Sequence, residues 1–198
     1  MNIPFNMEFT FDKNLWEVPV SQTEMEQGVQ FLKKQLAGLA TSEAEQASIY
    51  GLVGVYSRIL RKFEESKSNL QVAIELNRKA NNKKGLFVNE LRLAHTYQWE
   101  GNFHQANKLF TKLIDEAEKS DILEVYLDFI YQHQGRNLFD QKNYWMAEDF
   151  FKKALHIRNT KGNEELLIST RHALSVCAER ANSGDPLNND STSLGRKE

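Results

Sequence analysis

LAHTYQWEGNFHQANKLFTKL, from Leu93 to Leu113, is the stretch that decides the fold. It predicts two helices that meet at a tight turn. Ala94 lies on the apolar stripe of the first helix and Ala106 on that of the second, with larger apolar residues around them. A small residue at the same height on each helix lets the two backbones approach closely. Gly101 lies between the helices, where the chain needs a residue that tolerates positive φ.

The same pattern occurs three times along the chain. Pairs of small residues twelve positions apart are Gly54 with Ser66, Ala94 with Ala106, and Gly135 with Ala147. The first members of successive pairs are 40 and 41 residues apart. Three further columns keep this register, and they hold Phe63, Phe103 and Tyr144, then Leu70, Phe110 and Phe151, then Ala73, Leu113 and Ala154. Columns in phase over three copies predict an array of helical hairpins.

We therefore expect hairpins at about 43–60 with 63–80, 83–100 with 103–119, and 121–141 with 144–160. A helix at about 21–38 precedes them, and Ser42 with Glu45 forms a capping box before the next helix. A final helix at about 164–181 places Leu167, Thr170, Leu174 and Cys177 on its inward side. That helix suits an end cap, because the last hairpin of an array has no following neighbour.

The two ends of the chain differ from this pattern. Residues 1–20 mix aromatic residues with Asp, Asn and Pro, which predicts an extended arm that packs on the first helices. The alternative is that this arm docks on a binding surface of its own chain. Residues 183–198 are polar and nearly free of large apolar side chains, so we expect a disordered tail.

Composition narrows the class of protein. The chain has 198 residues, of which 40% are hydrophobic and 26% charged, and its net charge is -2. A nucleic-acid surface needs a basic excess, so we expect no nucleic-acid partner. No signal peptide and no run of about 20 apolar residues occurs, which predicts no membrane association. The single cysteine, Cys177, fits a reducing compartment, and we expect a cytoplasmic location.

These columns resemble the tetratricopeptide repeat (TPR). The middle copy matches best, through Leu93, Ala94, Tyr97, Gly101, Phe103, Ala106 and Phe110, and the third matches through Gly135, Tyr144, Ala147, Phe151 and Ala154. The first copy departs at Ser57, Arg61 and Ser66, where the family has an aromatic residue, glycine and alanine. The period of 40 to 41 residues exceeds the usual value of about 34. It is similar to the longer variant in kinesin light chain and in bacterial peptide-pheromone receptors.

The resemblance implies an all-α fold, a right-handed superhelical α-solenoid of TPR-like hairpins with a C-terminal capping helix. Its helical domain spans 21–182, with repeats at about 47–80, 87–120 and 128–161 and the capping helix at 164–181. In such a stack the first helix of each hairpin lines a concave groove. The residues that this places in the groove are Val55, Arg58, Val88, Leu91, Arg92, His95, Gln98, Trp99, Phe129, Gln132, Arg136 and Phe139.

We expect this groove to bind a segment of a partner protein or a peptide, which makes the chain a non-catalytic interaction scaffold. Aromatic residues would supply buried area, while Arg and Gln would bond a peptide backbone or a carboxylate. The alternatives are packing of these residues on the 1–20 arm, a peptide-responsive regulator, and a structural homo-oligomer. Trp145 suits either hairpin packing or an exposed contact.

The sequence gives little support for catalytic activity, so we expect that the chain is not an enzyme and that it binds no cofactor and no metal. The histidines are His95, His104, His133, His156 and His172, and they form no HExxH motif and no pair at spacing four. Cys177 lies on an apolar stripe and is expected in the core rather than as a nucleophile. No phosphate-binding loop, dinucleotide fingerprint or GxSxG motif occurs.

Overall fold

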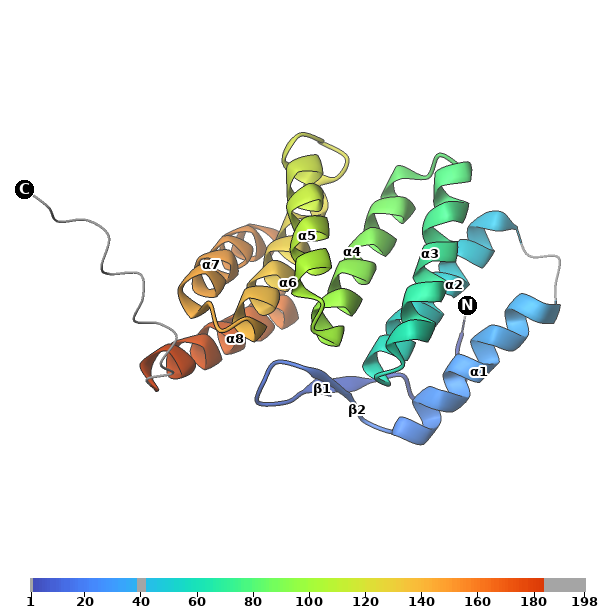
Figure 1. The fold of residues 1–198 in the computed structure, drawn as a ribbon, viewed down its shortest axis with the longest axis horizontal. Helices are drawn as coiled ribbons and strands as arrows, with labels where there is room; N and C mark the ends of the chain where they lie inside the picture. The colour runs from blue at the N-terminus through green and yellow to red at the C-terminus, as the bar shows by residue number, and fades with distance from the viewer. Residues whose placement is uncertain (1, 39–41, 184–198) are drawn as a thin grey trace, which may run out of the picture. The chain divides into compact units, whose positions relative to one another are not determined.

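A computed structural model describes residues 2–38 and 42–183 of the chain. The chain divides into two compact units, Met1–Val125 (unit 1) and Tyr126–Glu198 (unit 2). The described residues are mainly helical, with one short β-hairpin, so the predicted all-α class is confirmed (Figure 1). Residues 184–198 of the expected disordered tail lie outside the described residues.

Unit 1 begins with a β-hairpin at the place of the expected arm. Strands β1 (Phe9–Phe11) and β2 (Glu17–Pro19) pair antiparallel. The helices that follow are α1 (Gln22–Gly38), α2 (Glu43–Ile59), α3 (Phe63–Lys79), α4 (Lys83–Glu100) and α5 (Phe103–Glu118). Each helix packs on the next, and α2 also contacts α4 (Figure 1). The predicted helices of this unit are confirmed to within one residue at either end.

Unit 2 contains the third hairpin and the last helix. Its helices are α6 (Leu127–Asp140), α7 (Tyr144–Lys161) and α8 (Glu164–Asn182), and α8 packs on both others. The prediction of a helix from 121 was wrong, because α6 starts at Leu127 after a short 3-10 helix, Glu124–Tyr126. The backbone N–H groups of Leu123 and Glu124 both bond to the carbonyl of Ser120, each at 2.9 Å. This turn uses the residues that the sequence pattern assigned to the first turn of the helix.

The small-residue pairs lie where the helices of a hairpin touch. A Cβ added at Gly54 would lie 2.5 Å from the side chain of Leu70, and one at Gly135 would lie 2.6 Å from the ring of Phe151. The hydroxyl of Ser66 donates to the carbonyl of Gly54 at 2.7 Å. These contacts leave no room for a larger side chain, so the predicted close approach is confirmed for the first and third hairpins.

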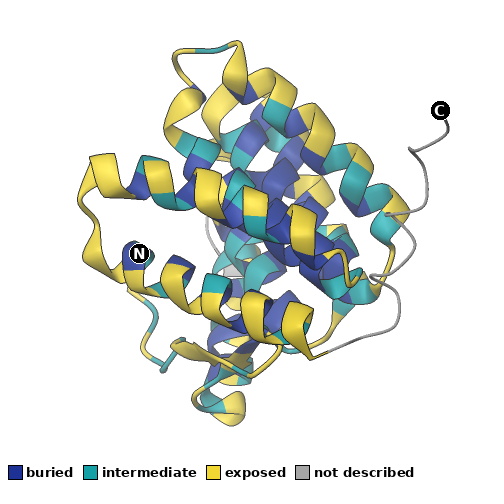
Figure 2. Cartoon of the chain, turned by 90° about the vertical axis from the view of Figure 1, so that its left-hand side faces the viewer, coloured by how far each residue is buried: buried dark blue, intermediate teal, exposed yellow. Residues whose placement is uncertain are grey.

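The core follows the columns that the sequence repeats. Fully buried side chains in these columns are Leu70, Ala73, Phe110, Leu113, Phe151 and Ala154. In Figure 2 buried residues follow the inward stripes of the helices, and exposed residues follow the outward stripes. Helix α8 also buries Leu167, Thr170 and Cys177, as predicted, whereas Leu174 is only partly buried.

The turns repeat as regularly as the helices. Asparagine caps α4, α5, α7 and α8, with its side chain accepting the N–H of the residue three positions on; the caps are Asn82, Asn102, Asn143 and Asn163. The turn inside each hairpin has one residue at positive φ: Arg61 at 62°, Gly101 at 83° and Lys142 at 62°. Only the middle copy uses glycine there, so the other two turns carry a local backbone cost. The predicted capping box of Ser42 and Glu45 is present.

Cys177 belongs to the core of unit 2. Its side chain is buried, and its thiol donates to the carbonyl of Tyr144 at 3.2 Å. Burial raises the pKa of the Cys177 thiol to about 11, and the carboxylate of Glu148 acts in the same direction. A thiol that resists ionisation is a poor nucleophile at neutral pH, so the predicted core role is confirmed.

Candidate functional site

The predicted groove residues divide between the two units. In unit 1, α2 carries Val55 and Arg58, and α4 carries Val88, Leu91, Arg92, His95, Gln98 and Trp99. In unit 2, α6 carries Phe129, Gln132, Arg136 and Phe139. Each group is therefore described within its own unit.

In unit 1 the predicted groove already holds part of the chain. The indole of Trp16, from the β-hairpin, stacks on that of Trp99 with ring centroids 5.1 Å apart and planes 17° apart. The guanidinium of Arg58 lies 4.4 Å from the Trp99 ring centroid. That of Arg61 lies 3.7 Å from the Trp16 ring and 4.6 Å from the Trp99 ring. With Glu17, these residues form what we call the tryptophan–arginine cluster, in which cation–π contacts hold the stacked rings.

Glu17 fixes the β-hairpin to α2. Its carboxylate accepts a hydrogen bond from the Arg58 guanidinium, and the side chains of both residues are less than 8% exposed. Two charges removed from water are tolerated only as a pair, since either one alone would be strongly destabilised. The ion pair therefore ties the position of the hairpin to that of Arg58.

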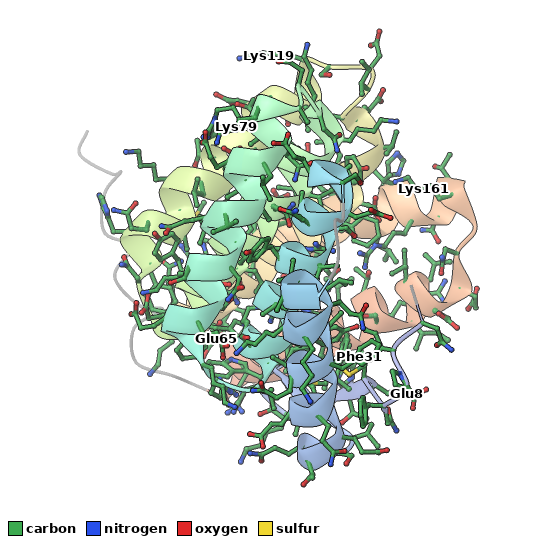
Figure 3. The ribbon with its side chains drawn as sticks, turned by 90° about the vertical axis from the view of Figure 1, so that its right-hand side faces the viewer. Glu8, Phe31, Glu65, Lys79, Lys119 and Lys161 are labelled. Carbon is green, nitrogen blue, oxygen red and sulfur yellow. The ribbon has the colours of Figure 1, made fainter. Side chains whose placement is uncertain are left out.

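The loop between the two strands presents Trp16 for this stack. The carboxylate of Asp12 accepts the backbone N–H groups of Asn14 at 2.8 Å and of Trp16 at 2.9 Å. Leu15 turns the chain at a φ of 63° and buries its side chain. The N-terminal segment also contacts α1, where Phe5 packs edge-on against Phe31, labelled in Figure 3, at a centroid distance of 6.3 Å. The hairpin is thus held by α2 and α4, and the segment before it by α1.

Arg92 lies beside the cluster on α4. Its guanidinium donates to the Asn89 side chain at 3.1 Å, and it reaches α2 at Gly51, where an added Cβ would lie 2.7 Å from Nη1. Burial lowers the pKa of the Arg92 guanidinium; Tyr56 opposes this effect, and the positive charge of Arg58 adds to it. Burial likewise raises the pKa of Tyr56, and Arg92 opposes that change. Arg92, Tyr56 and Arg58 therefore share one partly desolvated region.

The other predicted residues of unit 1 lie around this region. His95 meets Trp99 edge-on at a centroid distance of 5.4 Å. Leu91 and Gln98 are buried, while Val55 and Val88 are half-buried. Binding by these residues stays a prediction, but the structure brings Arg58, His95 and Trp99 together.

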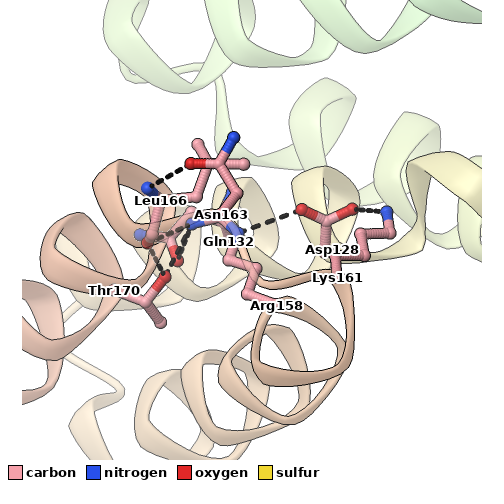
Figure 4. A network of polar contacts seen from close by, with 7 residues as sticks. All are labelled: Asp128, Gln132, Arg158, Lys161, Asn163, Leu166 and Thr170. Atoms are coloured by element: carbon pink, nitrogen blue, oxygen red, sulfur yellow. Dashed lines mark hydrogen bonds and ion pairs between the residues drawn. The ribbon is translucent and has the colours of Figure 1, made fainter.

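In unit 2 the predicted groove residues have partners within the unit. Gln132 accepts a hydrogen bond from Arg158 at 3.2 Å (Figure 4). The Arg158 guanidinium also lies 5.4 Å from the ring centroid of Phe129. Phe139 packs on Tyr144 with ring centroids 5.4 Å apart, and Arg136 is buried. The contacts of Phe129, Gln132 and Phe139 join α6 to α7, so they hold the helices of this unit together.

The tryptophan–arginine cluster includes residues that the sequence analysis did not place in the groove. Trp16 belonged to an arm that was expected on the first helices, and its stack on Trp99 matches the alternative in which the arm docks on the chain's own surface. Glu17 gave no signal, since one acidic residue in a polar segment has no period. Arg61 was noted only as a departure from glycine in the turn.

Further surface features lie outside this region. A depression of about 430 Å³ beside α1 is lined by Phe5, Phe31, Lys62 and neighbouring residues, and one of about 440 Å³ lies between the ends of α4 and α5. Trp145 on α7 is 77% exposed, so it does not pack between hairpins in the described residues, and its role as an exposed contact stays a prediction. Residues 2–38 and 42–183 hold no group of three or more His, Cys, Asp or Glu side chains that could bind a metal.

Within the same described ranges, every helix is too short or too polar to cross a membrane. Comparison with models of protein families gives no match, and comparison with curated proteins gives none either.

Proposed function

We propose that this protein is a non-catalytic scaffold that binds a segment of a partner protein on the face of unit 1 formed by α2 and α4. One observation carries the proposal: this face already accommodates a segment of polypeptide, the β-hairpin, through an aromatic stack and a buried ion pair. Aromatic and arginine anchors of this kind supply much of the affinity in protein–protein contacts. The proposal includes a TPR-like solenoid and a cytoplasmic location.

The position of the β-hairpin favours a second candidate, a peptide-responsive regulator. A segment that covers Trp99 and Arg58 would have to leave before a partner could use the same contacts. Such a partner would displace the hairpin, and a further protein could then bind the displaced hairpin. The scaffold and the regulator share one site, so one binding assay serves both.

The assay uses the hairpin itself as the probe. The full chain carrying Trp16→Ala and Glu17→Gln loses the stack and the ion pair, which loosens the hairpin. A fluorescein-labelled peptide with residues 6–20, amidated at its C-terminus, is titrated with this variant and with the unmodified chain. We expect fluorescence anisotropy to rise with the variant, because its face is open, and to rise far less with the unmodified chain.

Two controls make the result specific. A peptide that carries the same two substitutions should not bind, since it lacks both anchors. Adding Trp145→Ala to the variant should leave binding unchanged, because Trp145 lies in unit 2. Circular dichroism checks that the variant is folded. If the folded variant does not bind the unmodified peptide, the proposed function is contradicted.

A further inference from the structure

Arg92 is a partly buried cationic side chain on α4, whereas lysines of unit 1 without an ion pair among the described residues, such as Lys34, Lys84 and Lys108, are exposed. Its one hydrogen bond among the described residues goes to the neutral side chain of Asn89, and within these residues it forms no ion pair. Lysines and arginines that do pair with a carboxylate in this unit include Lys33, Arg58, Lys62, Lys67, Arg78 and Lys112. Arg92 is nonetheless partly buried, so its charge is costly where it lies.

The charges around Arg92 increase this cost. Arg58 is near enough for its positive charge to act on Arg92, and Glu17, the carboxylate on that side, is bound by Arg58. The Arg61 guanidinium lies over the tryptophan rings of the same cluster. Three arginines thus meet the one carboxylate named here, Glu17, so these four side chains together carry a net positive charge in a chain whose net charge is -2. A positive, partly desolvated region attracts an anion more strongly than an exposed arginine does.

The geometry fixes the guanidinium in place. Arg92 extends from α4 over Gly51 of α2, and Asn89 holds one of its terminal nitrogens. A guanidinium with fixed orientation presents its other N–H groups as a planar fork, which matches the two oxygens of a carboxylate.

We propose that Arg92 is a binding site for a side-chain carboxylate of the partner segment. This inference rests on the proposed function, and it adds that the partner is acidic: beside a group equivalent to Glu17 it carries a second Asp or Glu. A carboxylate suits the site better than a phosphate dianion, which calls for a second cation, because Arg58 is already paired. The β-hairpin thus occupies the aromatic part of the face and leaves the anion-binding part, at Arg92, to the ligand.

The first test does not depend on the hairpin peptide. The full chain, labelled with ¹⁵N, is titrated with sodium glutarate, and the Nε–Hε resonances of arginine are followed by NMR. Sodium chloride at the same ionic strength is the reference, and Arg92→Gln assigns the signal. We expect a saturable shift of the Arg92 resonance with glutarate and only a small shift with chloride.

Arg78 is the matched control, because it is exposed and paired with Glu75. Its resonance should follow ionic strength alone. An Arg92 resonance that moves no more than that of Arg78 overturns the site. A tighter response to inorganic phosphate than to glutarate overturns the choice of a carboxylate.

The second test places a carboxylate on the ligand. Because Val18 is exposed and points away from the face that Glu17 contacts, each uncharged residue of peptide 6–20 other than Leu15 and Trp16 is replaced by Glu in turn, which keeps the anchors and adds one charge at every other position of the segment. We expect at least one of them to bind the Trp16→Ala and Glu17→Gln chain about fivefold to tenfold more tightly than the parent peptide. Adding Arg92→Gln to the chain should remove this gain and leave affinity for the parent peptide nearly unchanged.

The outcomes separate the two proposals. If the parent peptide binds but no acidic peptide gains affinity, or the gain survives Arg92→Gln, the carboxylate site is wrong and the proposed function stands. If no peptide binds, the proposed function fails. The glutarate titration then tests independently whether Arg92 binds a carboxylate.

Discussion

Both units bury an arginine beside a carboxylate, but the carboxylates come from different kinds of segment. In unit 2, Arg158 on α7 bonds to Asp128 on α6 at 3.0 Å and to Thr170 on α8 at 2.6 Å (Figure 4). In unit 1, the carboxylate that pairs with Arg58 on α2 comes from the β-hairpin, at Glu17. The first arrangement joins three packed helices, whereas the second joins a helix to a segment outside the helical hairpins.

This difference decides what each arginine can do. Nη1 of Arg158 also donates to Gln132 and to the carbonyl of Leu166, so Nε and Nη1 both bond to groups of unit 2. Exposing it would require the helices to separate. Arg58 would be exposed if the hairpin alone moved away, which breaks far fewer contacts. We infer that the arginine of unit 2 stabilises the fold, while that of unit 1 lies where one segment can replace another.

The largest expected effect tests the internal network of unit 2. Asp128→Ala leaves Arg158 buried without its carboxylate, and we expect the free energy of unfolding to fall by about 3–5 kcal/mol. Urea unfolding followed by circular dichroism measures this loss. Asp149→Ala is the control: Asp149 pairs with Lys153 where both are about half exposed, so its removal should cost less than about 1 kcal/mol. A similar small loss for Asp128→Ala would show that the network does not stabilise the unit.

A second prediction tests whether the interior of unit 2 is closed to water. The pKa of the Cys177 thiol is raised from 9.0 to about 11, so the unfolded chain ionises first as pH rises. The contribution of the neutral thiol to stability is complete below pH 9 and is lost as pH rises through about 11. We expect the stability difference between the unmodified chain and Cys177→Ala to change by up to about 2 kcal/mol between pH 8 and pH 11. A difference that is independent of pH would mean that water reaches the thiol.

The matching prediction for unit 1 concerns the anchor of the hairpin. Glu17→Gln removes the partner of Arg58, but the hairpin can detach and let water reach the guanidinium. We therefore expect a smaller loss of stability, about 1–2 kcal/mol, together with faster cleavage by trypsin after Lys13 in the hairpin loop. Glu8→Gln, at an exposed position, should change neither quantity. A loss as large as that of Asp128→Ala would show that the hairpin is as integral to unit 1 as α8 is to unit 2.

The small-residue contacts allow a closer comparison of the two units. Gly54→Ala presses a methyl group on Leu70, a flexible side chain, and Gly135→Ala presses it on the rigid ring of Phe151. Each substitution also raises the helix propensity of its position, which stabilises the helix by about 1 kcal/mol. We expect Gly135→Ala to be the more destabilising, by about 1 kcal/mol, when both are measured by urea unfolding. Equal values would mean that the ring of Phe151 moves as easily as Leu70.

The smallest effect concerns the turns. Lys142 has a φ of 62°, so Lys142→Gly relieves backbone strain, and we expect a gain of about 0.5 kcal/mol after the entropy cost of glycine. Arg61 has the same φ in unit 1, but Arg61→Gly also removes the cation–π contact with Trp16 and should give no gain. Thermal unfolding of the two variants distinguishes these results. A gain in both would show that the contact of Arg61 contributes little.

Local and repeated features were predictable from the sequence. The eight α-helices of the described residues, the capping box at Ser42 and the close contacts at Gly54 and Gly135 all follow from periods or spacings within one helix or one hairpin. The candidate site was predictable only in part. The face with Arg58, Arg92 and Trp99 was predicted from the resemblance to TPR hairpins, but its contacts with the hairpin were not.

The sequence by itself determined the helical hairpins, because an apolar stripe and a pair of small residues twelve positions apart act over short distances along the chain. Only the tertiary structure decided which segments supply the carboxylate partners of Arg58 and Arg158. Glu17 pairs with Arg58 from 41 residues away, and Asp128 pairs with Arg158 from 30. Such pairs have no period in the sequence, since they depend on how separate elements pack. For the same reason, the packed structure was needed to show that Trp16 stacks on Trp99. It was also needed to show that the nearby Arg92 has no carboxylate partner among the described residues.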